Sequence, residues 1–365
     1  MNHHFMAATD ALLPPRVTIV TPSYNQAPFL EETILSVLDQ DYSNLEYIII
    51  DGGSSDGSVE IIKKYADRLA HWVSEPDQGQ SHALNKGFAR ATGDILAWLN
   101  SDDTYEPDAL WPVVQMAARH PEAELFHGDC AFIDEHNQKM GFLSSSGFQA
   151  GKLLSPSWGY PYPRNLPQPA VFFRRSLWEC AGPLDLGLHY AMDYDLWIRM
   201  SRCGAFHYVP RTLANYRLSK GTKTVSQMIP MVADVLGVTA RHGGLTHGGW
   251  ALASYFMDIT GAGLSPLRAF TYLHQVTQTW PEQTRSFFDP GRAASYAYLG
   301  RAFQLAREGR SRELTLRYVT LALARNPTLA LQLPDAIPFL SSWLKMKLGD
   351  PGAIDLSALR QGQRP

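Results

Sequence analysis

The sequence lacks the features that identify several large classes of protein. Cysteine is scarce: the 365 residues contain 3, Cys130, Cys180 and Cys203, which lie far apart and form no CxxC pair. This usage is typical of a reducing compartment and predicts neither a disulfide scaffold nor a zinc site. No apolar run approaches the roughly 18 residues that a membrane-spanning helix needs, and the opening residues read as a flexible leader rather than a secretory signal. We therefore expect a cytoplasmic protein, with peripheral contact at the inner face of the membrane as an alternative.

An excess of charge of one sign is also missing. Lys and Arg number 32 against 35 Asp and Glu, for a formal net charge of −3, which argues against a dedicated nucleic-acid-binding protein. Hydrophobic residues make up 45% of the chain and aromatic residues 11%, enough for a sizeable core. The length predicts one large domain and a smaller one.

Several sequence motifs of common enzyme families are absent. The chain has no GxGxxG after a strand, no GxxxxGK[ST], no HExxH and no GxSxG. The dinucleotide-binding, P-loop, zincin and α/β-hydrolase interpretations therefore lose their main support.

The first third of the chain alternates strand-like and helix-like patterns. Short β-branched runs end in polar and turn residues, and amphipathic segments separate them. The predicted strands are 17–21, 47–51, 95–100 and 125–128, and the predicted helices are 28–38, 58–65 and 81–91. This alternation predicts an α/β fold whose mainly parallel sheet is flanked by helices.

Composition divides the rest of the chain. The segment 144–169 is rich in Ser, Gly, Pro and aromatic residues, which predicts a functional loop or lid, or else a surface connection. From about residue 226 helical patterns replace strands. We expect a flexible leader (1–15), an α/β domain (16–225) and a helical region (226–365) that contains a hairpin near 292–327, loosely similar to a tetratricopeptide unit.

A last amphipathic segment lies near the C-terminal end. Phe339, Leu340, Trp343, Leu344 and Leu348 share one helical face. This face could contact a membrane surface, or it could pack against the rest of the protein.

Polar clusters follow the predicted strands at the edge where open α/β sheets bind ligands. They are the segments 21–25, 51–57 and 100–103, together with 75–79 before the third helix. An acidic cluster after a buried strand is costly unless a cation compensates it, and carboxylate oxygens suit Mg²⁺ or Mn²⁺, which would hold a diphosphate. The alternative is that each Asp caps a helix or makes a local turn.

These clusters, in this order, resemble glycosyltransferase family 2, the inverting enzymes of the GT-A fold. The matching strings are TPSYN, IIIDGGSSDGS, EPDQGQSHALNKG, ATGDILAWLNSDD, QPAVFFRR and MDYDLW, between residues 17 and 224. The resemblance implies metal-dependent, inverting transfer of a sugar from a nucleotide-sugar donor, UDP-sugars being favoured. The acceptor would be a saccharide or a lipid-linked molecule, in cell-surface or exopolysaccharide synthesis.

The resemblance also implies roles for single residues. Asp193, which opens the helix DYDLWIRM, would be the catalytic base, and Asp102 and Asp103 would hold the metal. Nucleotide contacts would come from Thr21, Tyr24, Asn25, Asp51, Asp77 and Lys86. Contacts with the donor sugar or the acceptor would come from Ser101, Asp102, Gln168 and Trp197.

Alternatives remain for the helix that carries the predicted base. Asp193 can be a helix-N-terminal carboxylate that the macrodipole favours. Asp195 competes for the role of base, although a supporting role suits it better. Trp197 can equally be a core residue.

The chain departs from the family pattern at two positions. Asn100 stands where many members carry the first Asp of a D-x-D motif, and Ser219 stands where many carry a His. Arg217, Lys220 or Lys223 would then neutralise the pyrophosphate, unless they form a solvated basic loop.

These departures keep a second function open: a catalytically silent member that binds nucleotide or glycan and contacts a protein partner through its C-terminal helices. A third interpretation, a sugar nucleotidyltransferase, is weak because its glycine-rich basic loop is absent.

Overall fold

The structure is a computed structural model that describes residues 14–153, 166–219, 234–235, 237–238, 241–242, 298, 302, 305 and 312–325. The chain forms two compact units, residues 1–153 with 165–231, and residues 154–164 with 232–365. Most of the predicted leader (1–15) lies outside the described residues, as does the middle of the predicted loop 144–169.

The first unit is built on one sheet of nine strands. Their order is β3-β2-β1-β4-β8-β6-β9-β5, and β7 pairs with β6 outside this path. The strands are β1 (Val17–Ser23), β2 (Leu45–Asp51), β3 (His71–Ser74), β4 (Ile95–Trp98), β5 (Thr104–Tyr105), β6 (Ala123–Ile133), β7 (Lys139–Leu143), β8 (Val171–Arg174) and β9 (Ala205–Arg217).

Strands β3, β2, β1 and β4 are all parallel. β8 runs antiparallel between β4 and β6, whereas β6 and β9 are parallel. Parallel strands are typically buried on both faces, which is why Ile48–Ile50 and Ile95–Trp98 read as continuous apolar runs.

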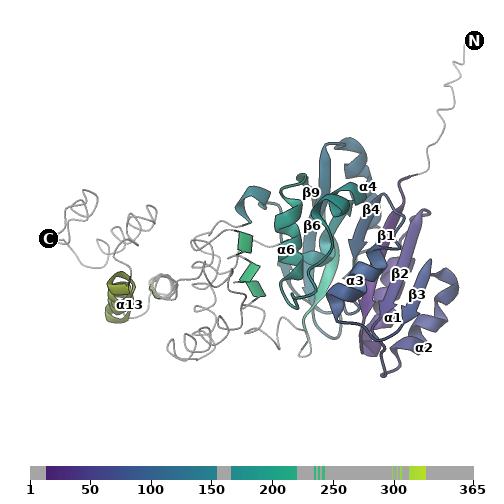
Figure 1. Ribbon diagram of the computed structural model, residues 1–365, viewed down its shortest axis with the longest axis horizontal. Helices are drawn as coiled ribbons and strands as arrows, with labels where there is room; N and C mark the ends of the chain where they lie inside the picture. The colour runs from purple at the N-terminus through teal and green to yellow at the C-terminus, as the bar shows by residue number, and fades with distance from the viewer. Residues whose placement is uncertain are drawn as a thin grey trace, which may run out of the picture. The chain divides into compact units, whose positions relative to one another are not determined.

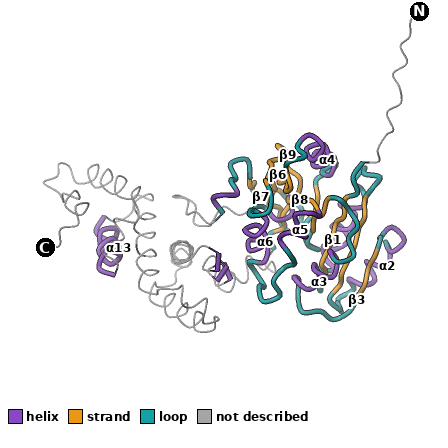
Figure 2. Tube along the Cα trace, turned by 45° about the horizontal axis from the view of Figure 1, so that its top comes forward, coloured by secondary structure: helices purple, strands orange, loops and turns teal. Residues whose placement is uncertain are grey.

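Helices cover both faces of this sheet (Figure 1), and the strands form the central layer in Figure 2. The helices are α1 (Ala27–Leu38), α2 (Ser58–Lys64), α3 (Gln80–Phe88), α4 (Leu110–Arg119), α5 (Arg175–Ala181) and α6 (Met192–Met200), with 3-10 turns at Ala66–Arg68, Ala150–Lys152 and Gln168–Ala170. The α/β fold expected from the sequence, with its mainly parallel sheet flanked by helices, is confirmed.

The two faces of the sheet have different cores. On one face, aliphatic residues of α1, α2 and α4 pack with β-strand residues such as Ile19 and Ile49. On the other face, aromatic rings from α3, α5 and α6 pack on Trp98 and Phe173. There the ring of Trp197 stacks on Trp98, with 5.3 Å between the centroids and 20° between the planes. Such stacking adds to the area that large rings bury.

β9 is the longest of the strands that the sequence analysis missed. Its sequence, AFHYVPRTLANYR, alternates poorly because Pro210 and Arg211 interrupt it. The register between β6 and β9 shifts on either side of Asp129, so β9 bulges at this interruption.

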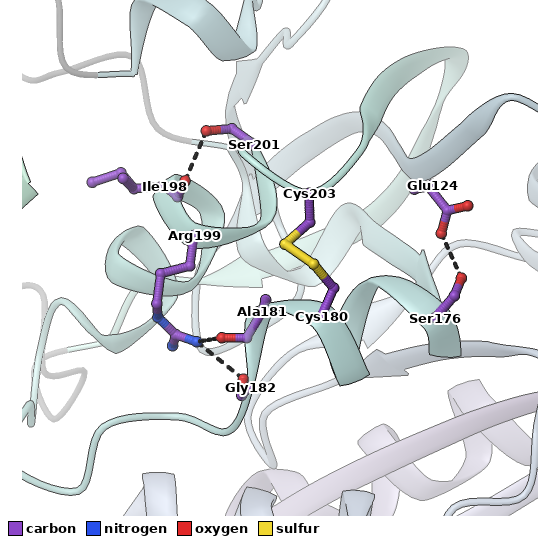
Figure 3. Close-up of a disulfide and its surroundings, with 9 residues drawn as sticks. All are labelled: Glu124, Ser176, Cys180, Ala181, Gly182, Ile198, Arg199, Ser201 and Cys203. Atoms are coloured by element: carbon purple, nitrogen blue, oxygen red, sulfur yellow. Dashed lines mark hydrogen bonds between the residues drawn. A yellow bond between two sulfur atoms is a disulfide. The ribbon is translucent and has the colours of Figure 1, made fainter.

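A disulfide joins Cys180 in α5 to Cys203 just after α6, with 6.2 Å between the two Cα atoms (Figure 3). This corrects the expectation drawn from the cysteine count. The sequence separation of 23 gives no hint of a pair, because only the packing of α5 on α6 brings the thiols within bonding distance. Cysteine usage therefore no longer supports a reducing compartment.

Among the described helices, none combines the length and hydrophobicity needed to cross a bilayer.

The second unit is described in part. The helical run predicted at the end of the hairpin is present as α13 (Arg312–Arg325). The ring of Tyr298 lies 5.9 Å from that of Tyr318 on α13, and the hairpin itself stays a prediction. The predicted amphipathic face at 339–348 lies outside the described residues.

Candidate active site

The carboxyl ends of the parallel strands meet at one edge of the sheet, which we call the carboxyl edge. In the register, Ser23 at the end of β1 lies beside Asp51 at the end of β2, and Asp51 lies beside Ser74 at the end of β3. The N–H of Leu99, just after β4, donates to Val20 O (3.0 Å). Ligands of open α/β sheets bind at such an edge.

Asp51 organises the loop that follows β2. Its side chain is fully buried (0% exposed). Oδ2 accepts hydrogen bonds from the N–H groups of Gly53 (3.1 Å) and Ser54 (2.9 Å) and from Ser74 Oγ (2.7 Å), and Oδ1 accepts one from Ser54 Oγ (2.6 Å). A buried carboxylate needs such donors, and these hold the loop rigid at the carboxyl edge.

Asp77 lies directly against this loop. A Cβ placed on Gly52 would come within 2.9 Å of Asp77 Oδ2, so only glycine leaves room for the carboxylate. The other oxygen, Oδ1, accepts a hydrogen bond from the N–H of Gly79 (2.7 Å), where φ is +104°. Glycine suits that left-handed conformation. The structure therefore brings Asp77 beside the end of β2.

The loop after β1 is fastened to the same place. Asn25 donates its N–H to Ser54 Oγ (2.8 Å) and accepts at Oδ1 from the N–H of Ser55 (2.9 Å). Tyr24 is 63% exposed beside this junction. An exposed aromatic ring at the carboxyl edge has a face that can pack against a nucleotide base.

Thr21 and Lys86, which were predicted to contact the nucleotide, are both engaged with other residues of the protein. Thr21 is buried, and its hydroxyl shares a hydrogen bond with the Tyr47 hydroxyl (3.0 Å), so it lies beneath the surface of the edge. Lys86, on the last turn of α3, forms an ion pair with Glu75.

The tip of β4 carries the predicted metal ligands. Ser101 and Asp103 are buried, whereas Asp102 is half-buried. Oδ1 of Asp103 accepts from the N–H of Arg217 (2.9 Å), and Oδ2 accepts from Asn100 Nδ2 (3.3 Å). Burial raises the pKa of Asp103 well above its usual range, and the nearby charge of Asp102 adds to this.

Asp103 has a structural role in these surroundings, and the metal role that the resemblance implied for it stays a prediction. With 1% exposure and both oxygens engaged, this carboxylate ties the tip of β4 to β9. Asp102 is the carboxylate of this tip that is not buried.

Arg217 also differs from its predicted role at a pyrophosphate. Its side chain is 1% exposed at the end of β9. The guanidinium donates to Glu32 Oε2 (2.8 Å) and to Asp102 O (2.8 Å), and it lies over the ring of Phe29. The structure thus assigns Arg217 to holding the tip of β4. Lys220 and Lys223 lie outside the described residues.

Three amides connect this tip to its neighbours. Asn100 Nδ2 donates to Gln168 Oε1 (3.0 Å), and Gln168 Nε2 donates to Trp98 O (2.8 Å). Gln80, at the start of α3, donates from Nε2 to Asn100 Oδ1 (2.7 Å). The sequence analysis singled out Gln168 but missed Gln80, although its position right after the EPDQG cluster placed it at the carboxyl edge.

Helix α6 presents the predicted base. Asp193 is half-buried in the first turn, where its Oδ1 accepts from the N–H of Tyr194 (2.7 Å). Asp195 is buried and forms an ion pair with Arg199 (2.8 Å). The supporting role is therefore the one that the structure favours for Asp195. Arg199 in turn donates to Ala181 O and to Gly182 O, which fastens α6 to α5 (Figure 3).

Trp197 belongs to the core. With 0% exposure, its ring is buried against Trp98 and cannot reach a sugar, so the packing alternative is the one that its burial supports.

The start of α6 is close to the start of α3. The hydroxyl of Ser81, next to Gln80, contacts Met192 Sδ (2.9 Å) and Leu188 O (3.2 Å). Met192 precedes Asp193, so the fold brings the predicted base toward the carboxyl edge. Such a contact joins segments more than 100 residues apart in the sequence.

The residues at the tip of β4 fit a metal that is bound jointly with substrate. Within the described part of the chain, no group of three or more His, Cys, Asp or Glu side chains gathers to hold an ion alone. Mg²⁺ is commonly held by one or two carboxylates and completed by phosphate oxygens and water. Asp102 would supply the carboxylate of such a site.

Comparisons with known proteins find a matching family and similar relatives. The profile of the family described as Glycosyl transferase family 2 matches residues 18–180, from β1 into α5. A "PGL/p-HBAD biosynthesis glycosyltransferase" from Mycobacterium bovis is 30% identical over 189 residues, which are 51% of this chain and 69% of that protein.

Solved structures share the fold. S. aureus TarS 1–349 in complex with UDP-GlcNAc has a TM-score of 0.53 at 14% identity, covering 81% of this chain and 93% of that one. The crystal structure of S. aureus TarS 1–349 has a TM-score of 0.52 at 15% identity, covering 81% of this chain and 93% of that one.

Proposed function

The chain belongs to glycosyltransferase family 2, and from this premise we propose that it moves a sugar from a nucleotide-sugar donor to a saccharide or lipid-linked acceptor by a metal-dependent, inverting displacement. One observation carries the proposal: Asp51, Asp77 and the tip with Asp102 lie at a single edge, and α6 brings Asp193 toward it.

The nucleotide would lie over the ends of β1, β2 and β3. There the rigid loop around Asp51 and the exposed ring of Tyr24 form a platform, and Asp77 stands at its side. UDP-sugars are the first donors to test, because TarS, which shares the fold, was solved with UDP-GlcNAc.

Asp102 would hold the divalent ion, Mg²⁺ or Mn²⁺, together with the diphosphate. When bound, such an ion supplies positive charge that offsets the charge of the leaving nucleoside diphosphate. The chain orients this carboxylate through its backbone: Asp102 O accepts from Arg217, and Asp103 N–H donates to Asn100 O (3.1 Å).

Asp193 would act as the general base. Its carboxylate takes the proton of the acceptor hydroxyl as that oxygen attacks the anomeric carbon and the bond to the diphosphate breaks. A single displacement inverts the anomeric configuration, so no second carboxylate is needed as a nucleophile. The first turn of a helix is a favourable place for a charged carboxylate.

Calorimetry tests the donor site. UDP, GDP, dTDP and CMP are titrated into the wild type with and without Mn²⁺, beside Asp102→Ala and the exposed control Asp67→Ala. We expect one nucleoside diphosphate to bind in a Mn²⁺-dependent manner, with at least tenfold weaker binding for Asp102→Ala only, because a metal ligand is lost. A folded wild type that binds none of the four would refute the proposal.

Turnover tests the base. Asp193→Asn keeps the shape but cannot accept the proton, so we expect the rate of transfer to fall at least a hundredfold while nucleotide affinity stays unchanged. A wild type that binds nucleotide yet transfers sugar to no acceptor would instead support the silent, binding-only alternative.

A further inference from the structure

Asn100 stands at the first position of the acidic motif, and its contacts explain why an amide occupies it. Nδ2 donates to Gln168 Oε1 (3.0 Å) and to Asp103 Oδ2 (3.3 Å), and Oδ1 accepts from Gln80 Nε2 (2.7 Å). Both ends of the amide are therefore used within the protein.

The orientation of this amide is set by a backbone group. Trp98 O can only accept a hydrogen bond, so Gln168 must direct its NH₂ group toward it (2.8 Å). Gln168 then presents Oε1 to Asn100, and this oxygen also can only accept. Asn100 must therefore donate from its own NH₂ group to this oxygen. Its Oδ1 then accepts the hydrogen bond from Gln80. Each amide thus fixes the next.

A carboxylate cannot replace this amide. Aspartate at position 100 would place an oxygen against two acceptors, Gln168 Oε1 and Asp103 Oδ2, in a largely buried place. A proton shared with Asp103 would satisfy only one of these contacts. Buried polar groups that face each other without a hydrogen between them are costly.

We propose that Asn100 is a positioning residue that requires an amide: through Gln80, Gln168 and Asp103 it holds the tip of β4 so that Asp102 presents its carboxylate to the metal and the diphosphate. This inference rests on the proposed function. It departs from the simpler view that Asn100 is a weakened metal ligand, which restoring aspartate would improve.

The tip transmits this constraint to Asp102 over a short distance. The N–H of Asp103 donates to Asn100 O (3.1 Å) and closes a turn that contains Asp102. The side-chain amide of Asn100 also donates to the Asp103 carboxylate, so it links the first and last residues of this turn. On the far side, Arg217 Nε donates to Asp102 O (2.8 Å). A shift of Asn100 therefore moves the backbone of Asp102 against a fixed guanidinium.

The test compares UDP binding with and without Mn²⁺. UDP is titrated calorimetrically into the wild type, Asn100→Asp and Gln115→Glu, first in EDTA and then in saturating Mn²⁺. Gln115 is exposed on α4, so its variant makes the same chemical change away from the network. For Asn100→Asp we expect the affinity gain from Mn²⁺ to fall about tenfold, while the affinity in EDTA stays within twofold of the wild type. Gln115→Glu keeps the full gain.

An equal or larger Mn²⁺ gain in Asn100→Asp would overturn the inference, because a restored metal ligand would produce it. A general structural loss would weaken binding in EDTA as well, and that outcome also counts against a positioning role.

If Asn100→Asp does not fold, a second variant tests whether the amide network positions Asp102. Gln80→Glu places a carboxylate oxygen against Asn100 Oδ1, yet it sits in the first turn of α3, where an acidic side chain is well tolerated. We expect the same selective loss of the Mn²⁺ gain, and a gain like the wild type's would overturn the inference. A wild type that binds no UDP, GDP, dTDP or CMP would refute the proposed function and this inference together, whereas unchanged variants of a binding wild type refute the inference alone.

Discussion

At the scale of single residues, neighbouring carboxylates have different surroundings. Asp102 and Asp103 are adjacent in the sequence, but Asp103 is buried between Asn100 and Arg217, and Asp102 is half-buried at the turn. The same holds for Asp193 and Asp195, of which the second is paired with Arg199. In each pair the buried carboxylate stabilises the fold, and the half-buried one lies nearer the surface, where we propose that it acts on substrate or metal.

Gly52 gives a residue-scale prediction. Alanine there would place a methyl group 2.9 Å from Asp77 Oδ2, and the carboxylate would have to move away from the end of β2. We expect Gly52→Ala to weaken nucleotide binding about tenfold, with a change in the free energy of unfolding below about 0.5 kcal/mol, since a side-chain end yields easily. Calorimetry and urea unfolding measure the two effects.

The matched control is Gly151→Ala, because nothing lies within 4 Å of a Cβ placed on Gly151. Unchanged nucleotide affinity in Gly52→Ala would show that Asp77 does not contact the nucleotide.

At the scale of elements, α5 and α6 form one rigid pair beneath the predicted base. Arg199 joins them through the carbonyls of Ala181 and Gly182, and the disulfide Cys180–Cys203 joins them a second time (Figure 3). Two independent links to α5 keep α6, and with it Asp193, in one orientation.

The disulfide makes a prediction about stability. It closes a loop with a sequence separation of 23, for which chain entropy predicts a stabilisation of about 3 kcal/mol. We expect dithiothreitol to lower the free energy of unfolding of the wild type by about this amount and to leave Cys180→Ser/Cys203→Ser unaffected. Nucleotide affinity should persist in both, because Arg199 still joins the helices. A wild type insensitive to dithiothreitol would contradict the disulfide.

At the scale of the whole molecule, a buried network beyond the predicted site joins β6 to the segment after β7. His127 Nδ1 contacts Ser145 Oγ (2.8 Å), and Asp129 accepts from the N–H of Ser145 (2.8 Å) and from the Tyr208 hydroxyl (2.7 Å). Burial lowers the pKa of His127 to about 4, although the Asp129 charge opposes this.

Stability should therefore depend on pH through His127. Below pH 6.5 the unfolded chain protonates this side chain, whereas the folded chain does so only near pH 4. The free energy of unfolding then falls as the pH drops from about 6.5 to about 4, by up to about 3 kcal/mol, and His127 adds nothing further below that. Urea unfolding at several pH values measures the slope.

His127→Asn removes the titrating group and should flatten this part of the profile relative to the wild type. The exposed His136→Asn is the control and should retain the wild-type slope. Equal slopes in all three proteins would mean that His127 is not buried in its neutral form.

The fold and the site were predictable from the sequence to different degrees. The strands β1, β2 and β4 appear as apolar runs, and the polar clusters after them mark the carboxyl edge, because both signals lie within a few residues of each other. β9 was missed because Pro210 breaks its alternation. Because β9 was missed, the position of Arg217 at its end could not be predicted either. The N–H of Arg217 donates a hydrogen bond to Asp103 and so helps to keep this carboxylate within the fold.

By itself, the sequence indicated the α/β alternation and the edge at which we expect the chemistry, because periodicity and strand-end composition are local properties, and its motif strings carried the resemblance to the family. Only the tertiary structure decided that Cys180 meets Cys203, that Trp197 is buried on Trp98, and which of two adjacent carboxylates is buried. The ion pair of Arg217 with Glu32, 185 residues away, shows the physical reason. Burial and hydrogen bonding depend on distant segments, and local sequence patterns contain no information about them.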